Sequence, residues 1–565
     1  MLGKNKIKII LIAILFLATP LLARADELLN ERDFFVNSSY DLKSREKITA
    51  VLQRVSTQLY FYLEKQWWES LDIDKRKEVN IAIDELATEF ENNIYPVLTS
   101  NFGSEWRPGI DGDSRITVLV HPTVNQAAGY FSPGDEYPTA QVKNSNQREM
   151  VYLSPESLAN PARKGLLAHE FVHLITFNQK DKMKGISEEV WLNEGRAEYA
   201  PTLLGYDKQY DGSNLQQRVR NFLESPQDSL TEWRGKPSDY GVLNLFIQYL
   251  IDHYGKVILS DSLHSDKIGI PSIDEALKKN GFKETFSQIF TDWTVAIFLN
   301  NCSVSPKYCY FNENLTNFKI TPFIYFLPSS GESTLSVSSL AKDWSGNWQK
   351  IIGGQQSLKL DFSTDPKNNF KVPYIVEKSS GNFSVNFIQL DQSQKGTVYI
   401  KDGKITSLTI LPSAQNKTSN FTNNEPPYQF SWAASSEQSA GAEEEAIKQL
   451  KERIASLEAT IAFLQSQIAS VPGVTITCRS IENNLYYGMK NNQQVSCLQR
   501  FLKNQGPEVY PGGLITGNFG NLTYQAVIRF QEKYKTEILA PAGLEKGTGF
   551  VGLSTRSKIN KMLLL

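Results

Sequence analysis

Apolar residues in the N-terminal half of the chain recur mainly at steps of three and four residues, the period of an amphipathic helix. This spacing predicts that residues 26–105 are mainly helical, as in Ile48, Val51, Leu52 and Val55. Two β-branched runs, 116–120 and 150–153, predict strands. Helical spacing then returns from residue 161 to about 300, with the first of these helices beginning near Pro161.

The pattern changes after residue 320. Short alternating runs such as 357–362 and 397–400 are separated by Gly, Asn, Asp and Ser, which predicts a small antiparallel β-sandwich over residues 321–412. The tetrapeptide at 401–404, Lys-Asp-Gly-Lys, is a hairpin turn signal. Residues 413–442 hold few large aliphatic side chains and predict a flexible linker.

A heptad pattern follows, with isoleucine at every a position and leucine at every d position. It predicts a coiled coil over residues 443–470, and this choice of residues favours two parallel strands. A solitary helix packed on its own chain is the alternative, but a strict stripe favours a partner, so we expect a parallel homodimer. The seam consists of Ile447, Leu450, Ile454, Leu457, Ile461, Leu464 and Ile468.

The N-terminus carries an export signal. Lysines at 4, 6 and 8 precede an apolar run at 9–22, and Ala-Arg-Ala at 23–25 offers a cleavage site, so residues 1–25 are a predicted signal peptide. An uncleaved anchor is the alternative. Export to an oxidising compartment agrees with the cysteines, which lie in two close pairs, Cys302 with Cys309 and Cys478 with Cys497. We therefore expect a secreted or envelope protein with one local disulfide in each of two regions.

Length and charge limit the class of protein. A chain of 565 residues is too long for one core, so several domains are expected. The balance of 59 basic against 61 acidic residues gives no electrostatic argument for nucleic-acid binding.

The chemistry of the chain is concentrated in a HExxH motif at 169–173. Residues four apart lie on one face of a helix, so His169 and His173 can bind one metal ion, with Glu170 beside them to take a proton from water. Glu194 supplies a carboxylate that completes a set of three ligands. Three protein ligands leave one position open, which is the arrangement of catalytic zinc.

The segment 191–195, Trp-Leu-Asn-Glu-Gly, makes the pattern resemble the gluzincin metallopeptidases, whose third ligand is a glutamate on a second helix. The resemblance covers roughly residues 110–260 and implies a zinc peptidase domain over 106–320. It implies that Glu198 supports a zinc-bound histidine. The runs 128–132 and 145–153 look like the strands that precede the helix in hyicolysin-like peptidases.

The resemblance also implies a mechanism of peptide hydrolysis. Zn²⁺ would activate water, Glu170 would take its proton and pass it to the leaving amine, and a tyrosine would stabilise the oxyanion. Tyr240 has the expected position and type, a packed core tyrosine being the alternative, and Tyr199 is a weaker candidate. The strand at 150–153 would pair with extended substrate backbone at the edge of the sheet.

Residues 474–565 resemble a small helical peptidoglycan-binding domain. The resemblance rests on 495–502 and 516–531, which contain turn glycines, Thr523 as a helix N-cap, and an Ala-Val-x-x-Phe-Gln run. An insertion at 539–552 departs from the family and could alter its binding groove.

Together these observations predict a multidomain α+β protein that acts as a secreted zinc endopeptidase on polypeptides and is held at the wall by its C-terminal module. No amine-binding motif of aminopeptidases is visible, which favours endopeptidase action. One alternative is a wall-binding adhesin or scaffold that lacks activity. Another is a peptidase that cuts peptidoglycan cross-links. Residues 26–105 could be a propeptide, a supporting layer or a substrate-binding region.

Overall fold

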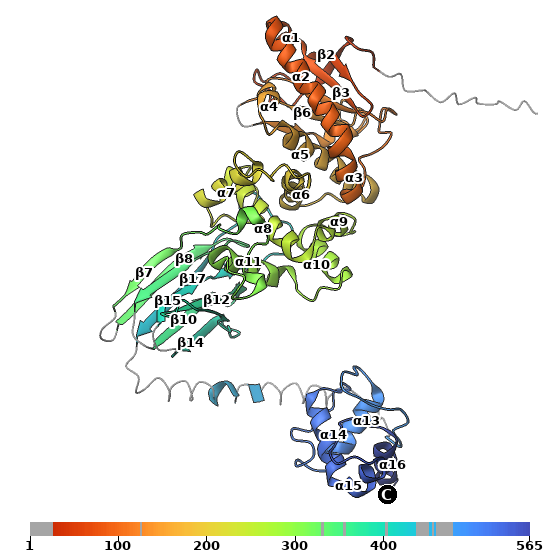
Figure 1. Ribbon diagram of the computed structural model, residues 1–565, viewed down its shortest axis with the longest axis vertical. Coiled ribbons are helices and arrows are strands. Elements are labelled where there is room, and N and C mark those ends of the chain that lie inside the picture. Colours follow the sequence, from red (N-terminus) through yellow and green to blue (C-terminus); the bar gives the residue numbers. More distant parts are fainter. Residues whose placement is uncertain are drawn as a thin grey trace, which may run out of the picture. The chain divides into compact units, whose positions relative to one another are not determined.

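The computed structural model forms two compact units, residues 1–447 and 448–565. It describes residues 26–124, 127–328, 333–353, 357–401, 405–436, 451–454, 457–458 and 478–564 (Figure 1). The predicted signal peptide at 1–25 lies outside the described residues. None of the described helices has both the length and the apolar character that a membrane span requires.

The first unit begins with a six-stranded sheet in the order β1-β2-β3-β4-β6-β5. β3 pairs with β4, and β4 with β6, in parallel, while the other neighbours are antiparallel. The strands are β1 (Glu31–Phe35), β2 (Lys47–Val55), β3 (Leu59–Glu64), β4 (Ile116–Val120), β5 (Gly129–Phe131) and β6 (Met150–Leu153).

The prediction of a mainly helical region at 26–105 is wrong for its first half, which forms β1, β2 and β3. In β2 the buried residues are Ile48, Ala50 and Leu52, an alternation of two that places them on one face of a sheet. When Ala50 is left out, the apolar residues Ile48, Val51, Leu52 and Val55 fall at steps of three and four, and this spacing indicated a helix. Helices follow only afterwards, as α1 (Lys65–Ser70), α2 (Ile73–Glu89) and α3 (Tyr95–Phe102).

Residues 26–105 also share one core with the region that follows. All six residues of β3 are buried, and β3 lies between β2 and β4 inside the sheet. Phe90, just after α2, packs its ring against Phe171 of α5 (Arg163–Thr176) at a centroid distance of 4.9 Å. Removing this region would expose the edge of β4, so it is an integral layer of the fold.

Helices complete this part of the unit. The helix that carries His169 begins at Arg163, two residues after the predicted start, and is preceded by α4 (Pro155–Ala159). The others are α6 (Val190–Leu203), α7 (Asn214–Glu224), α8 (Pro237–Tyr254), α9 (Val257–Leu263), α10 (Gly269–Lys279) and α11 (Phe286–Leu299).

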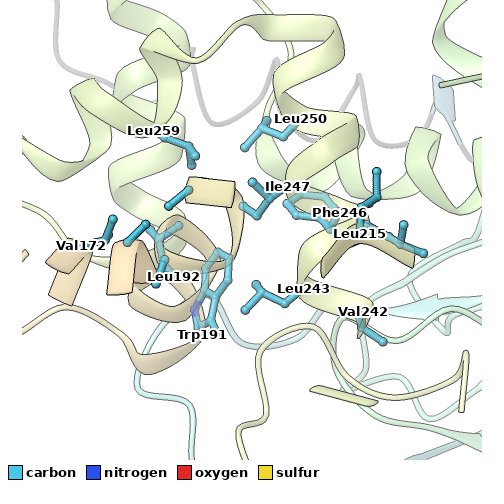
Figure 2. Packing of buried hydrophobic residues seen from close by; sticks show 14 of the residues in the cluster. Val172, Trp191, Leu192, Leu215, Val242, Leu243, Phe246, Ile247, Leu250 and Leu259 are labelled. Carbon is cyan, nitrogen blue, oxygen red and sulfur yellow. The ribbon is translucent and has the colours of Figure 1, made fainter. Parts of the chain in front are cut away.

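α6 is packed closely between α5 and α8. Figure 2 shows Trp191 and Leu192 among Val172 of α5 and Leu243 of α8. A Cβ atom on Gly195 would lie 3.1 Å from Leu243 Cδ1, so the absence of a side chain there lets the two helices approach.

Two sheets form the predicted β-sandwich, in the orders β14-β10-β17-β8 and β13-β12-β15-β9-β7. The pairs are antiparallel except β7 with β9. The strands are β7 (Phe323–Leu327), β8 (Ser333–Ala341), β9 (Gln349–Gly353), β10 (Leu358–Thr364), β11 (Phe370–Lys371), β12 (Pro373–Lys378), β13 (Phe383–Phe387), β14 (Lys395–Ile400), β15 (Ile405–Ile410), β16 (Ser413–Ala414) and β17 (Tyr428–Ser436).

Two predictions in this region are wrong. Most of the predicted hairpin turn at 401–404 lies outside the described residues, but the strands that flank it, β14 and β15, belong to different sheets and do not pair with each other. The predicted linker at 413–442 contains β16 and β17, and the backbone NH of Asn420 donates to Glu189 Oε1 (2.7 Å). Backbone NH groups of this segment, at Asn420 and Glu425, donate to the carboxylates of Glu189 and Glu232 in the helical region, and composition alone did not distinguish such contacts from solvation.

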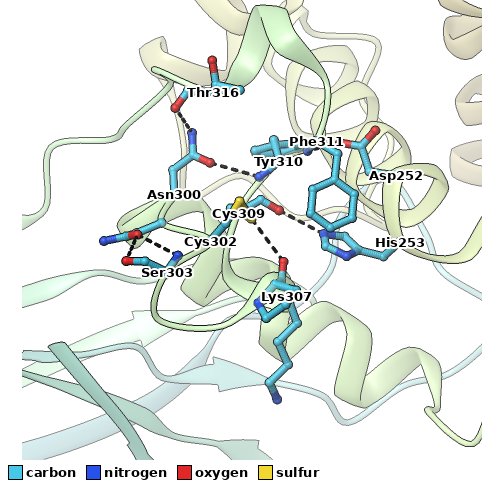
Figure 3. Close-up of a disulfide and its surroundings, with 12 residues drawn as sticks. Asp252, His253, Asn300, Cys302, Ser303, Lys307, Cys309, Tyr310, Phe311 and Thr316 are labelled. Atoms are coloured by element: carbon cyan, nitrogen blue, oxygen red, sulfur yellow. Dashed lines mark hydrogen bonds between the residues drawn. A yellow bond between two sulfur atoms is a disulfide. The ribbon is translucent and has the colours of Figure 1, made fainter.

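Both expected local disulfides are present, Cys302–Cys309 and Cys478–Cys497. In the first loop, His253 Nε2 lies 2.9 Å from the carbonyl oxygen of Cys309, and the Phe311 ring covers the imidazole (Figure 3). His253 lies near the end of α8. Burial lowers the pKa of this histidine, which holds the disulfide loop against α8.

The second unit is helical and internally repetitive. The carboxamide of Gln499 binds the backbone NH groups of Thr516 and Gly517 and the hydroxyl of Thr523, and Gln531 binds Thr548, Gly549 and Thr555 in the same way. The helices are α13 (Gln493–Asn504), α14 (Asn521–Lys533), α15 (Lys535–Ile538) and α16 (Leu553–Leu563).

The predicted insertion at 539–552 contains Thr548 and Gly549, so it carries the second glutamine-centred turn. The N-cap prediction for Thr523 is wrong. Thr523 lies inside α14, whose N-cap is Gly520. Its buried hydroxyl accepts a hydrogen bond from Gln499 and forms another with the hydroxyl of Tyr510. Most of the predicted coiled coil at 443–470, including Ile447 and Ile468, lies outside the described residues.

Asp41 ties the segment after β1 to the sheet. Its buried carboxylate accepts hydrogen bonds from the Arg45 guanidinium (2.8 Å) and from the backbone NH groups of Lys43 and Arg45. Arg45 also pairs with Glu64 at the end of β3 (2.6 Å). Burial acts to raise the pKa of Asp41, but the hydrogen bonds from Arg45 and Lys43 outweigh it and lower the pKa to about 2.

We expect Asp41→Asn to lower the free energy of unfolding by about 2 kcal/mol at neutral pH. The folded pKa lies below the unfolded value near 3.8, so the contribution of Asp41 is complete above that value and is lost as the pH falls toward 2. Urea denaturation across this pH range measures it, with Asp74→Asn on the exposed face of α2 as the control. A difference between wild type and variant that persists at the lowest pH would contradict this assignment.

Candidate metal centre

α5 and α6 bring the three predicted ligands together. Glu194 Oε2 lies 3.3 Å from His169 Nε2, and Glu194 Oε1 lies 3.8 Å from His173 Nε2. One ligand atom from each of the three residues falls within 4.8 Å of the others, and among the described residues no other group of three or more His, Cys, Asp or Glu ligands lies this close together. The structure therefore assembles residues that lie 20 positions apart along the chain.

The outer nitrogen of each imidazole faces an oxygen. His169 Nδ1 lies 3.3 Å from Glu198 Oε1, and His173 Nδ1 lies 3.1 Å from Asn193 Oδ1. A carboxylate or amide oxygen accepts a hydrogen bond, so a proton on Nδ1 of each ring would leave the Nε2 lone pair facing Glu194 when a metal ion is bound. This is the tautomer that two metal-binding histidines need. Glu194 Oε2 is buried and accepts no hydrogen bond from the described residues, as expected for an oxygen that a cation would complete.

Arg218 of α7 is the site residue that the sequence analysis missed. Its guanidinium donates to both oxygens of Glu198, at 2.6 and 2.7 Å, and Asn214 donates to Oε2 at 3.1 Å. Burial opposes ionisation of Glu198, but Arg218 and His169 outweigh it and hold the pKa of Glu198 well below its usual range. An isolated arginine outside any motif gave no signal, because only the fold places it behind His169.

Glu170 lies on α5, next to His169, and is buried. Burial, with the nearby Glu194 and Glu198 carboxylates, raises the pKa of Glu170 to about 7, while His169 lowers it. Gly129 of β5 faces this carboxylate: a Cβ atom there would lie 3.0 Å from Glu170 Oε1. A side chain at position 129 would therefore press on Glu170.

Tyr240 lies in the first turn of α8, and its phenol ring is stacked 4.7 Å from the Arg218 guanidinium. Burial and the carboxylates of Glu194 and Glu198 raise the pKa of Tyr240 well above its usual value, so the hydroxyl stays protonated and able to donate. Tyr199, the weaker candidate, has its pKa raised to about 12 by burial and by Asp252 and Asp207. These neighbours lie apart from the ligand set, and Tyr199 is not drawn into the site.

The edge of the sheet beside the site differs from the prediction. The strand at 150–153, β6, was expected at the edge, but it is paired on both sides, by β4 and by β5. β5 is the outermost strand, and its Gly129 faces Glu170. A strand of three residues that contains glycine gives a weak sequence signal. The sequence analysis therefore assigned the edge position to β6 in place of its neighbour β5.

A cavity of about 490 Å³ opens beside His169 and Glu198. Its lining combines small and apolar residues (Ala162, Gly165, Leu166 and Pro201) with polar ones that include Asn214 and Arg218. The space is large enough for a side chain, and it gives the candidate site an adjoining recess.

Comparison with known families identifies one part of the chain. Residues 491–538 match the family described as putative peptidoglycan binding domain. The chain thus carries a peptidoglycan-binding-type domain, which agrees with the helical second unit and indicates association with the cell wall or envelope. The match covers α13 and α14, and the second glutamine-centred turn lies beyond it.

No curated protein matches the chain. Among solved structures, the chain is similar to CorA, a surface-associated copper-binding protein of Methylomicrobium album, and to PliG, a periplasmic inhibitor of g-type lysozyme from Aeromonas hydrophila. Each is 9% identical, covers 20% of this chain and 98% of its own, and has a TM-score of 0.14. Similarity at this level carries no argument about function.

We expect the purified chain to bind one Zn²⁺ and His173→Ala to lose it, because two ligands hold the ion poorly. Glu198→Gln should weaken zinc about 10–100-fold by removing the charged acceptor of His169. Competition with a chromophoric chelator measures both, and His264→Ala, an exposed histidine outside the cluster, serves as the control. Unchanged zinc affinity in Glu198→Gln would show that Glu198 does not support the ligand.

Proposed function

We propose that the chain is a zinc-dependent endopeptidase held at the cell wall or envelope by its peptidoglycan-binding-type domain. The observation that carries the proposal is the convergence of His169, His173 and Glu194 with a buried Glu170 directly beside them. Two imidazoles and one carboxylate are a ligand set that zinc enzymes use, with a fourth position left for water or substrate. A bound zinc ion would act as a Lewis acid toward a carbonyl oxygen and would lower the pKa of water.

The residues around this set fit peptide hydrolysis. Glu170, with a pKa near neutrality, can take a proton from the attacking water and deliver it to the amine that leaves. The protonated phenol of Tyr240 can donate to the oxygen that becomes negative in the tetrahedral stage. Glu198 and Arg218 keep His169 in one tautomer throughout.

The strand β5 and the adjoining cavity suggest how a polypeptide would lie. The outer edge of β5 has no strand partner among the described residues, so an extended peptide could pair with it beside Glu170. A side chain of that peptide could enter the recess lined by Ala162, Gly165 and Pro201. This arrangement favours internal cleavage of stretched polypeptides.

The decisive variant is Glu170→Gln, which keeps the shape of the side chain but cannot accept a proton. We expect zinc content to stay near one per chain and casein cleavage to fall by at least about 10²-fold. Glu156→Gln, an exposed change in α4, should leave both unchanged. Full activity in Glu170→Gln would overturn the proposed mechanism, and a zinc-loaded wild type without activity on casein or wall would favour a binding scaffold.

Attachment to the wall is tested with isolated sacculi. The full chain should co-sediment with peptidoglycan, whereas a chain ending at residue 436 should stay in the supernatant while keeping its casein activity. Release of muropeptides from the sacculi by the full chain would assign the cross-links as substrate, and cleavage of casein alone would assign polypeptides. Equal sedimentation of both chains would contradict the assigned role of the second unit.

A further inference from the structure

A second group of acids is buried in the sheet region, away from the histidines. Glu136 ends the short 3₁₀ helix η2 (Pro133–Glu136) that follows β5, and Glu149 directly precedes β6. Their exposed fractions are 2% and 3%. No lysine, arginine or histidine pairs with either carboxylate in the described part of the chain, which is unusual for buried charge.

Three oxygens of this pair are buried without a hydrogen-bond donor: both oxygens of Glu136 and Oε2 of Glu149. The remaining oxygen, Glu149 Oε1, accepts a hydrogen bond from the backbone NH of Ile110 (3.0 Å). Gly109 has a φ of +94°, and a Cβ atom on it would lie 1.7 Å from Glu149 Oε2, so only glycine lets this loop close over the carboxylate. The loop then places Asp111 near both glutamates, where it adds to their mutual repulsion.

Arg148, the residue directly before Glu149, is engaged elsewhere. Arg148 donates to Asp26 (2.6 Å) and to Thr117 (3.1 Å), and its Nε lies 3.3 Å from Asp111. Asp135 is likewise committed, because it accepts hydrogen bonds from the hydroxyl of Tyr152 and the backbone NH of Asn146. The glutamate pair therefore has no protein cation to balance it.

We propose that Glu136 and Glu149 form a calcium site, with Asp111 as the neighbouring acid. Leaving several buried carboxylate oxygens unpaired is costly, and a divalent cation bound between the two carboxylates would offset that cost. Hard oxygen donors select calcium or magnesium over transition metals. Calcium fits better, because magnesium retains several waters and demands octahedral geometry, whereas these oxygens are enclosed by protein.

The position of this site gives it a consequence. Glu136 and Glu149 stand at the two ends of the segment 137–148, which joins β5 to β6. A cation between them would clamp this segment and hold β5, the strand whose Gly129 faces Glu170. The calcium site would thus be separate from the zinc ligands but would support the edge strand beside them.

The test uses the full chain from residue 26, freed of all metals on a chelating resin and then reloaded with one equivalent of zinc. Titration calorimetry with calcium chloride should detect one ion per chain, and millimolar calcium should raise the Tm by several degrees, since binding to the folded state alone stabilises it. Magnesium should give a much smaller shift. No calcium binding by the wild type would overturn the proposal.

Glu136→Gln and Glu149→Gln should each lose the calcium-dependent rise in Tm while keeping zinc content and circular dichroism. The matched control, Glu156→Gln, should keep the full rise. Calcium binding of unchanged affinity in both variants would overturn the proposal. A wild-type Tm that falls with rising pH and does not change with calcium would also overturn it. That result would show that the two glutamates share a proton instead of binding a cation. These readouts do not depend on peptidase activity, so they separate this proposal from the proposed function.

Discussion

The packing of α6 between α5 and α8 is the constraint on which the candidate site depends. Trp191 and Leu192 are buried at the start of α6, and the missing side chain of Gly195 allows α8 to approach. Because Glu194 stands directly before this glycine, the same packing fixes where its carboxylate lies. A larger residue at 195 would push α6 away and separate Glu194 from both histidines. Apolar packing thus sets the geometry of a charged site.

The balance of charge among buried carboxylates is the second constraint on the structure. Around His169 the chain places three acids, Glu170, Glu194 and Glu198, but provides only Arg218 as a permanent cation. Glu198 is neutralised by that arginine, whereas Glu194 keeps an oxygen without a donor. Buried carboxylates of this kind are stable when a proton or a metal ion completes them. Glu136 and Glu149 raise the same physical problem in the sheet, with oxygen ligands in place of nitrogen, and this difference favours a harder ion.

The β-sandwich and the segment after it belong to the same compact unit as the candidate site. Glu232, after α7, accepts a hydrogen bond from the backbone NH of Glu425 (2.7 Å), and Trp348 Nε1 donates to the carbonyl of Thr294 in α11 (2.8 Å). Asn420 reaches Glu189, the residue that precedes α6. The sandwich therefore supports the helices from outside, and the peptidoglycan-binding-type domain forms a unit of its own with a core around Phe501 and Phe530.

The sequence by itself determined the local elements whose pattern is strong. The HExxH spacing placed His169 and His173 on one face of a helix, the paired cysteines indicated their own partners, and the alternating runs after residue 320 gave strands. Each of these depends on residues a few positions apart, where helix or strand geometry leaves little choice. The peptidoglycan-binding-type domain was predicted differently, from the resemblance of residues 495–502 and 516–531 to a known family.

Only the tertiary structure decided the remainder. β2 looked helical because four of its apolar residues coincide with a helical period, and pairing with β1 and β3 overrode that preference. The edge position of β5, the capture of Glu198 by Arg218 and the meeting of Glu136 with Glu149 all join distant segments. Such contacts leave no periodic trace in the sequence, because their energy comes from burial and charge pairing that exist only after the chain has folded.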